Sequence, residues 1–189
     1  MREGEQLHPE TVEEWHSWLV EHAATSTGVW LVGWKKHTGR PRVSYEDSVL
    51  EALAFGWIDS QAATLDDDRS MQRYTPRRPK SGWSRPNKER VARLQAEKRM
   101  TPAGQRMVDL AHETGTWSLL DDAENLVIPD DLTEAFVAHP GSREQWDAFP
   151  PSARRVMLAW ITTAKWAKTR AGRVEQTADK AARGERAHP

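Results

Sequence analysis

The sequence predicts an α+β protein, with a small antiparallel β-sheet flanked by helices and then an α-helical C-terminal subdomain. The runs that predict strands lie between residues 28 and 76, and helix signals account for most of the chain after that point. The length of 189 residues and a hydrophobic content of 38% suffice for a core without disulfides. We place the α+β domain at residues 1–122 and the helical subdomain, packed on it, at residues 123–189.

The first expected elements are a helix and a buried strand. Thr11 and Glu14 form a capping box, and the apolar residues after them recur at helical spacing. Residues 29–34 are a continuous apolar run rich in β-formers, which is typical of a buried strand. A turn follows, and residues 42–44 are expected to return as a short partner strand.

A second helix and a hairpin come next. Ser44 and Asp47 resemble a helix start, and Gly56 is a stop signal. Residues 57–64 and 71–75 flank a polar, Asp-rich turn, which predicts two paired strands. The expected sheet therefore occupies residues 28–76.

Helices account for the rest of the chain. Residues 76–86 contain three prolines and a glycine, so we expect an ordered loop there. Ser84 or Asn87 caps the next helix, and Thr101 before a proline starts another. Beyond a linker at 121–127, we expect helices near residues 130–137, 142–149, from 152, and 168–183.

Composition excludes several classes of function. With no cysteine, the chain has no disulfide, thiolate metal site or cysteine nucleophile. The seven histidines are scattered without a metal-binding spacing, and we predict no metal site and no cofactor. No apolar run is long enough to span a membrane, and the first residues lack a signal-peptide pattern. We therefore expect a cytoplasmic protein without a membrane span.

Charge is strongly segregated although the net charge is −1. Residues 76–100 hold nine basic against two acidic residues, and residues 154–186 hold nine against three. Between them, residues 109–147 hold ten acidic residues and one basic residue. The basic blocks either dock on the acidic block or face an anionic small molecule or an acidic protein partner. In the last block, Lys165, Thr169 and Arg173 form one stripe, for which we favour a contact with the acidic block.

Short motifs follow one another along the chain: Gly28–Val32, Lys35–Lys36, Ser44–Tyr45, Glu51–Leu53, Phe55–Ser60, Arg73–Arg77, Lys80–Ser84, Asn87–Val91, Met100–Gly104, Pro129–Leu132, Trp160–Ile161, Ala164–Lys165, Thr169–Arg170 and Arg173. In this order they resemble the bacterial YdeI/OmpD-associated family, whose members are also described as bacteriocin-protection proteins. The similarity covers the chain from about Trp18 to Arg186. The resemblance implies a role in resistance to stress or cationic antimicrobial peptides. It does not assign catalytic residues.

The loop at residues 77–87 is the candidate ligand site. Guanidinium groups bind phosphate or carboxylate with two hydrogen bonds, and an adjacent indole can stack on a ring. The alternative is that Trp83 is a core anchor and the basic residues are solvated. We expect a non-catalytic protein that binds an anionic or aromatic ligand here. The expected site residues are Asp59, Arg73, Arg77, Arg78, Lys80, Ser81, Trp83, Ser84 and Asn87.

Two other functions remain open. The basic blocks beside Trp83 suggest nucleic-acid binding, although a sequence pI of 6.7 argues against it. Glu51 and Asp59 with Tyr45 could form an acid–base site, but structural ion pairs are the commoner use of such residues. We lean against an enzyme. We expect Asp59 instead to form an ion pair with an arginine in residues 73–78, because a buried carboxylate needs a cationic partner.

Overall fold

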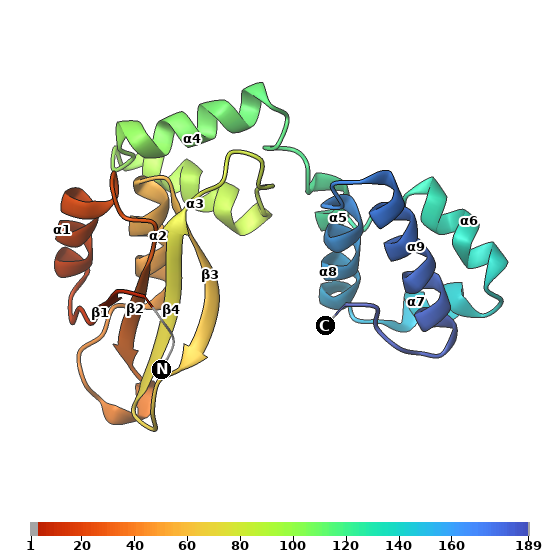
Figure 1. The fold of residues 1–189 in the computed structure, drawn as a ribbon, viewed down its shortest axis with the longest axis horizontal. Helices are drawn as coiled ribbons and strands as arrows, with labels where there is room; N and C mark the ends of the chain where they lie inside the picture. The colour runs from red at the N-terminus through yellow and green to blue at the C-terminus, as the bar shows by residue number, and fades with distance from the viewer. Residues whose placement is uncertain (1–3, 189) are drawn as a thin grey trace. The chain divides into compact units, whose positions relative to one another are not determined.

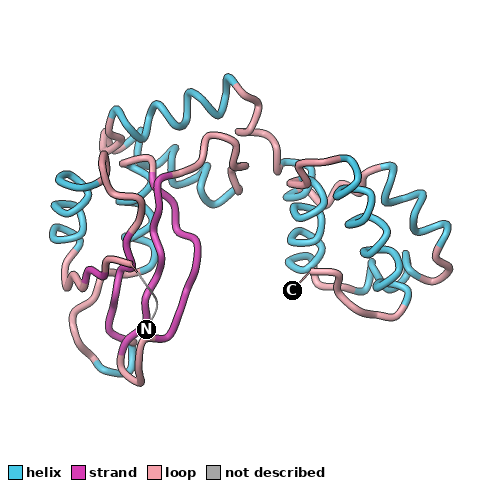
Figure 2. The backbone as a smooth tube through the Cα atoms, in the orientation of Figure 1, coloured by secondary structure: helices cyan, strands magenta, loops and turns pink. Residues whose placement is uncertain are grey.

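The computed structural model describes residues 4–188 as an α+β fold (Figures 1 and 2). The predicted fold class is confirmed. The chain divides into two compact units. The first comprises Met1–Ser81 and Pro86–Thr114, and the second comprises Gly82–Arg85 and Gly115–Pro189. The division at residue 114 falls earlier than the boundary that the sequence suggests, and the 82–85 segment belongs with the C-terminal helices.

The first unit is built on a mixed four-stranded sheet in the order β1-β2-β4-β3. Strands β2 (Val29–Trp34), β4 (Arg69–Pro76) and β3 (Trp57–Thr64) pair antiparallel. The pairing of β3 with β4 was predicted, whereas the pairing of β2 with β4 was not. Strand β1 (Gln6–Leu7) pairs parallel with β2 and was not predicted, because two residues cannot show alternation.

The expected partner strand at residues 42–44 is wrong. These residues are irregular, and β4 occupies the place beside β2. The reason lies at Ser44, whose hydroxyl accepts a hydrogen bond from the backbone N–H of Asp47 at 3.0 Å. This contact caps helix α2 (Tyr45–Ala54), so the chain turns into a helix instead of extending along the sheet.

Four α-helices and a short 3-10 helix complete the first unit. Thr11 accepts from the backbone N–H of Glu14 at 3.2 Å, which confirms the predicted cap of the first helix. Thr101 caps the last of them in the same way, through the N–H of Gly104. The elements are α1 (Val12–His22), η1 (Lys36–Thr38), α2, α3 (Arg85–Ala96) and α4 (Pro102–Glu113).

Trp15 packs helices α1 and α2 on one face of the sheet. Its ring lies 5.3 Å from that of Tyr74 on β4, and its indole N–H donates to the Ser48 carbonyl oxygen at 3.1 Å. The hydroxyls of Ser48 and Tyr74 are 2.6 Å apart. The opposite face carries a separate cluster around Trp30 and Met71.

The second unit is helical. Its helices are α5 (Asp121–Glu124), α6 (Asp130–Ala138), α7 (Ser142–Ala148), α8 (Pro151–Thr162) and α9 (Ala167–Ala182), and α5 falls within the expected linker. Val174, Ala178 and Ala181 of α9 point into a core around Trp146. Helices could be predicted in this unit because their buried apolar residues recur at helical spacing.

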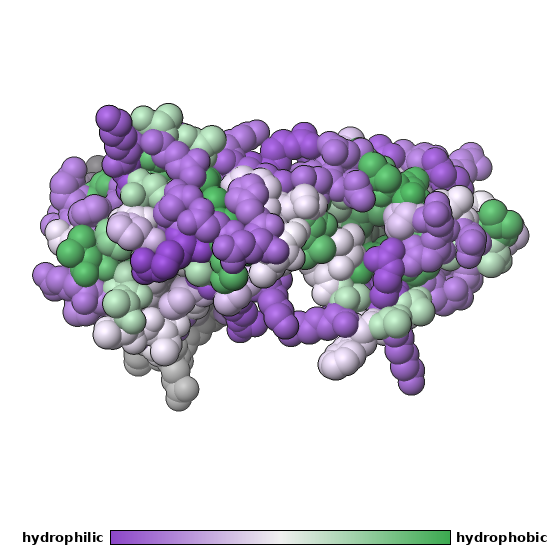
Figure 3. All heavy atoms as spheres, turned by 90° about the horizontal axis from the view of Figure 1, so that it is seen from above, coloured by the Kyte–Doolittle hydropathy of each residue, from purple (hydrophilic) through white to green (hydrophobic). Residues whose placement is uncertain are grey.

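One face of the molecule is predominantly polar (Figure 3). The face seen in Figure 3 is largely hydrophilic, with hydrophobic residues in small groups. Among the described residues, no helix has both the length and the apolar character needed to cross a membrane.

Candidate functional site

The residues expected to form a binding loop do not share one exposed surface. Trp83 is 2% exposed, and its ring lies 5.2 Å from that of Trp117 within the second unit. Arg77 is also buried, at 5% exposure, whereas Arg78 and Lys80 are exposed. Trp83 is thus a core residue, which is the alternative that the sequence left open, and the 82–85 segment that carries it belongs to the helical unit.

The polar members of the predicted set are used locally. The hydroxyl of Ser81 donates to the Arg78 carbonyl oxygen at 2.7 Å, and the side-chain oxygen of Asn87 accepts from Arg90 at 2.8 Å. Ser84 is partly buried in the second unit. These contacts stabilise the loop and the start of α3.

Arg73 lies on the sheet face opposite to α2. Its guanidinium is 5.8 Å from the ring centre of Trp30, its partner in the register of β2 and β4. Asp59, on β3, pairs in register with Tyr74 and therefore points to the α2 face. Arg73 and Asp59 therefore cannot share one site.

The expected ion pair between Asp59 and an arginine of residues 73–78 is wrong. Among the described residues, the Asp59 carboxylate forms no ion pair, and it accepts a hydrogen bond from the Tyr45 hydroxyl at 2.8 Å. Burial lowers the pKa of Arg77 to about 10, and the charge of Asp59 opposes that shift from beyond contact distance. A bulge in β3 after Asp59 accompanies this arrangement.

Glu51 and Asp59 do not form an acid–base pair around one cavity. Glu51 is buried at 5% exposure and binds the Nδ1 atom of His16 at 2.8 Å and the guanidinium of Arg99. Asp59 contacts Tyr45 instead. Neither carboxylate is among the lining residues of the sheet pocket described below.

The first basic block is partly neutralised by glutamates of its own unit. Arg90 binds Glu46 at 2.6 Å, and Arg93 binds Glu97 at 2.7 Å. In the second unit, Arg170 of the last basic block binds Asp131 of the acidic block at 2.8 Å. The expected contact between these two blocks therefore exists, through Arg170 rather than the predicted stripe.

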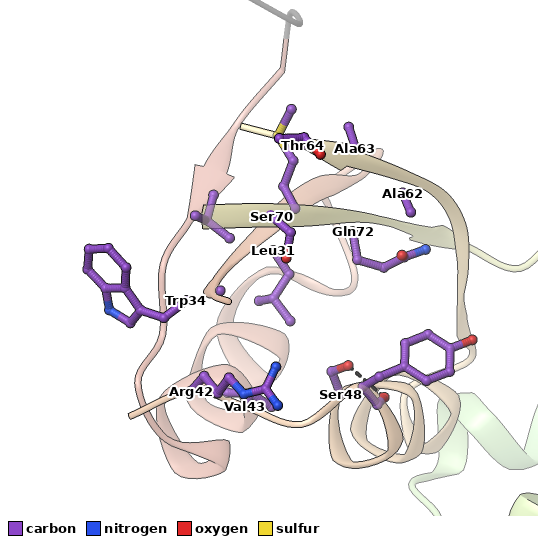
Figure 4. A pocket seen from close by; sticks show the side chains of 14 residues that line it. Leu31, Trp34, Arg42, Val43, Ser48, Ala62, Ala63, Thr64, Ser70 and Gln72 are labelled. Atoms are coloured by element: carbon purple, nitrogen blue, oxygen red, sulfur yellow. Dashed lines mark hydrogen bonds between the residues drawn. The ribbon is translucent and has the colours of Figure 1, made fainter. Parts of the chain in front are cut away.

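A pocket of about 470 Å³ lies on the sheet beside the N-terminal end of α2 (Figure 4). Strands β2, β4 and β3 form its floor, and the segment entering α2 forms one wall. All of its lining residues belong to the first unit. Its size is within the usual range for small-molecule sites.

The floor of the pocket consists of two rows of side chains across three strands. The strand register aligns Gly33 with Ser70 and Thr64, and Leu31 with Gln72 and Ala62. Residues two apart on a strand point to the same face, so the two rows are adjacent. Apart from Leu31 and Gln72, the residues of these two rows are small, so few long side chains rise from this part of the sheet.

Gly33 keeps the floor open. A β-carbon at this position would meet no atom within 4 Å, and the residue has ordinary strand geometry. The backbone conformation therefore does not require glycine here. Glycine inside a strand often marks a place where a ligand or a second backbone approaches closely.

The wall beside α2 is polar. Arg42 is exposed, and its side chain has no ion pair with another described residue. Tyr45 is 55% exposed, and its hydroxyl is held by Asp59. Asp59 thus positions Tyr45, which lines the pocket, although Asp59 is not itself a lining residue.

The titration of Tyr45 tests this positioning role. Burial, the hydrogen bond to Asp59 and the charge of Asp59 raise the pKa of Tyr45 to about 12. We expect Asp59→Ala to lower this pKa, because both effects of Asp59, its hydrogen bond and its charge, disappear. With two tyrosines in the chain, the ultraviolet absorbance of phenolate reports it. Asp59→Asn keeps a hydrogen-bond acceptor, so the pKa of Tyr45 should fall less in that variant. An equal Tyr45 pKa in the original protein and both variants would contradict the positioning role of Asp59.

The sign of the accompanying stability change follows from the same shift. A tyrosine whose pKa is raised by folding contributes its full stabilisation below its unfolded pKa of about 10. That stabilisation is lost as the pH rises through the folded value of about 12. Asp59→Ala should reduce this loss of stability in alkaline solution.

The fold and pocket define an α+β domain with an open sheet pocket, joined to a helical unit. The chain belongs to the family described as a domain of unknown function, DUF8412, whose model matches residues 7–107. Residues 125–184 match the family described as "Bacteriocin-protection, YdeI or OmpD-Associated". The resemblance inferred from the sequence is thus confirmed for the second unit.

The extent of that resemblance is narrower than the sequence suggested. The motifs from residue 28 to 104 lie in the DUF8412 match, outside the YdeI/OmpD-associated match. No curated protein and no solved structure matches the chain. Among the described residues, no group of three or more histidine, cysteine or carboxylate side chains is arranged to hold a metal ion.

Proposed function

We propose that this chain is a cytoplasmic, non-catalytic protein that binds an anionic or aromatic small molecule in the pocket on its sheet. The proposal moves the expected ligand site from residues 77–87 to the surface formed by β2, β4, β3 and the start of α2. The observation that carries it is the open space above Gly33, in a pocket with an apolar patch and one guanidinium. Binding sites commonly combine an apolar surface with a few polar groups.

The second unit supports a role in resistance. Its match to bacteriocin-protection, YdeI or OmpD-associated proteins favours a function in the response to stress or antimicrobial peptides. In this proposal the first unit senses or sequesters a small molecule, and the helical unit links that event to protection. Catalysis is not part of the proposal, since neither Glu51 nor Asp59 lines the pocket.

Filling the pocket tests the proposal directly. Gly33→Val adds a β-branched side chain, which suits a strand, in space that other atoms do not occupy. We expect isothermal titration against aromatic acids, nucleotides and sugar phosphates to detect at least one ligand. Gly33→Val should weaken the binding of that ligand about tenfold or more, and a tenfold loss corresponds to about 1.4 kcal/mol.

The matched control is Ser60→Val, because Ser60 is an exposed residue of β3 outside the pocket. This variant should bind like the original protein. Melting curves must show that both variants are folded. Silence across the whole panel, or unchanged binding by Gly33→Val, would remove the pocket as the site.

A further inference from the structure

We infer that the ligand is a planar aromatic ring bearing a single carboxylate, which lies flat on the floor of the pocket. The inference rests on the proposed function and names the chemical class that the same site selects. It depends on three features of the pocket: the small side chains of its floor, its single formal charge, and the polar side chains of Gln72, Ser70 and Thr64.

Shape favours a flat ligand. Gly33, Ser70 and Thr64 form one row across the sheet, and none of them has a long side chain. The neighbouring row ends in Leu31 and Ala62, which offer apolar surface. A flat ring can contact both rows at once and bury its faces, whereas a bulky saturated ring would contact the floor over a smaller area.

Charge favours one carboxylate over a phosphate. Arg42 is the one charged residue among those that line the pocket, and a guanidinium binds a carboxylate with two parallel hydrogen bonds. A phosphate monoester carries nearly two negative charges at neutral pH. The negative charge of Asp59, held against the hydroxyl of the lining Tyr45, disfavours a second negative charge in the pocket.

The remaining polar groups can bind a substituent on the ring. The side chains of Gln72, Ser70 and Thr64 form no hydrogen bond with another described residue, and all three line the pocket. In Figure 4, Gln72 extends from β4 toward the side of the pocket that carries Ser48. A hydroxyl or ring nitrogen on the ligand would pair with these groups, while its carboxylate pairs with Arg42.

Four probes separate these features by isothermal titration. They are 2-naphthoate, its neutral carboxamide, 2-naphthyl phosphate, and the fully saturated decalin-2-carboxylate. We expect 2-naphthoate to bind about tenfold or more tightly than each of the others, since charge-assisted hydrogen bonds contribute more than neutral ones. Arg42→Ala should reduce 2-naphthoate binding about tenfold and leave the carboxamide unchanged. Arg40→Ala, outside this pocket, is the control.

The outcomes distinguish the inference from the proposed function. If the phosphate, the amide or the saturated acid binds best and Gly33→Val removes that binding, the pocket is a ligand site and the inferred class is wrong. If 2-naphthoate binds but Arg42→Ala has no effect, the assignment of the carboxylate is wrong. If no probe binds and the wider panel is also silent, both the inference and the proposed function fail.

Discussion

Replacing Trp83 with alanine is expected to lower the free energy of unfolding by about 3–5 kcal/mol, as for other buried aromatic residues cut back to alanine. Trp83 is 2% exposed and packs against Trp117 in the second unit. The adjacent Arg85 is fixed there as well, with its guanidinium donating to Asn125 at 2.7 Å. The indole of Trp83 therefore holds the loop at residues 77–87 in place. Ligand binding in the sheet pocket should not need that indole.

Urea denaturation followed by circular dichroism measures the effect. Trp166→Ala is the matched control, because Trp166 is 73% exposed and its removal should change stability by no more than about 0.5 kcal/mol. If Trp83→Ala is as stable as Trp166→Ala but loses a ligand, the loop is a binding site and Trp83 was misassigned to the core.

Trp15→Ala is expected to have a comparable effect on the first unit, again about 3–5 kcal/mol. Its ring is fully buried, stacks 5.4 Å from Trp18, and holds α1 against Tyr74 of the sheet. Its removal also leaves the Ser48 carbonyl oxygen without its indole donor. Because Ser48 lines the pocket, this variant should also weaken any ligand bound there.

Val20→Ala provides the comparison on the same helix. Val20 is 62% exposed, so this change should shift the urea midpoint little. A Trp15→Ala protein that unfolds at the original midpoint would show that α1 does not depend on this packing.

Most of the fold could be predicted from local signals. Capping residues such as Thr11, Ser44 and Thr101 fixed where helices begin, and each makes the expected side-chain contact. The hairpin of β3 and β4 followed from two β-forming runs around a polar turn. The parallel pairing of β1 could not be predicted, because it depends on a contact between distant segments and spans two residues.

The site was harder to predict than the fold. The cluster of arginines around Trp83 suggested a ligand, but sequence does not show whether an indole faces solvent or a core. The pocket that the structure reveals has a weak signal: a glycine within a strand and small residues at positions 62 and 64. Tyr45 and Asp59 were recognised as neighbours in one polar cluster, and their hydrogen bond confirms that part of the hypothesis.

A crystal structure with bound 2-naphthoate tests the central claim most directly. We expect density for the ring across Gly33, Ser70 and Thr64, with the carboxylate on Arg42. Density for the probe at residues 77–87, with the sheet pocket filled only by solvent, would contradict it and return the site to the loop.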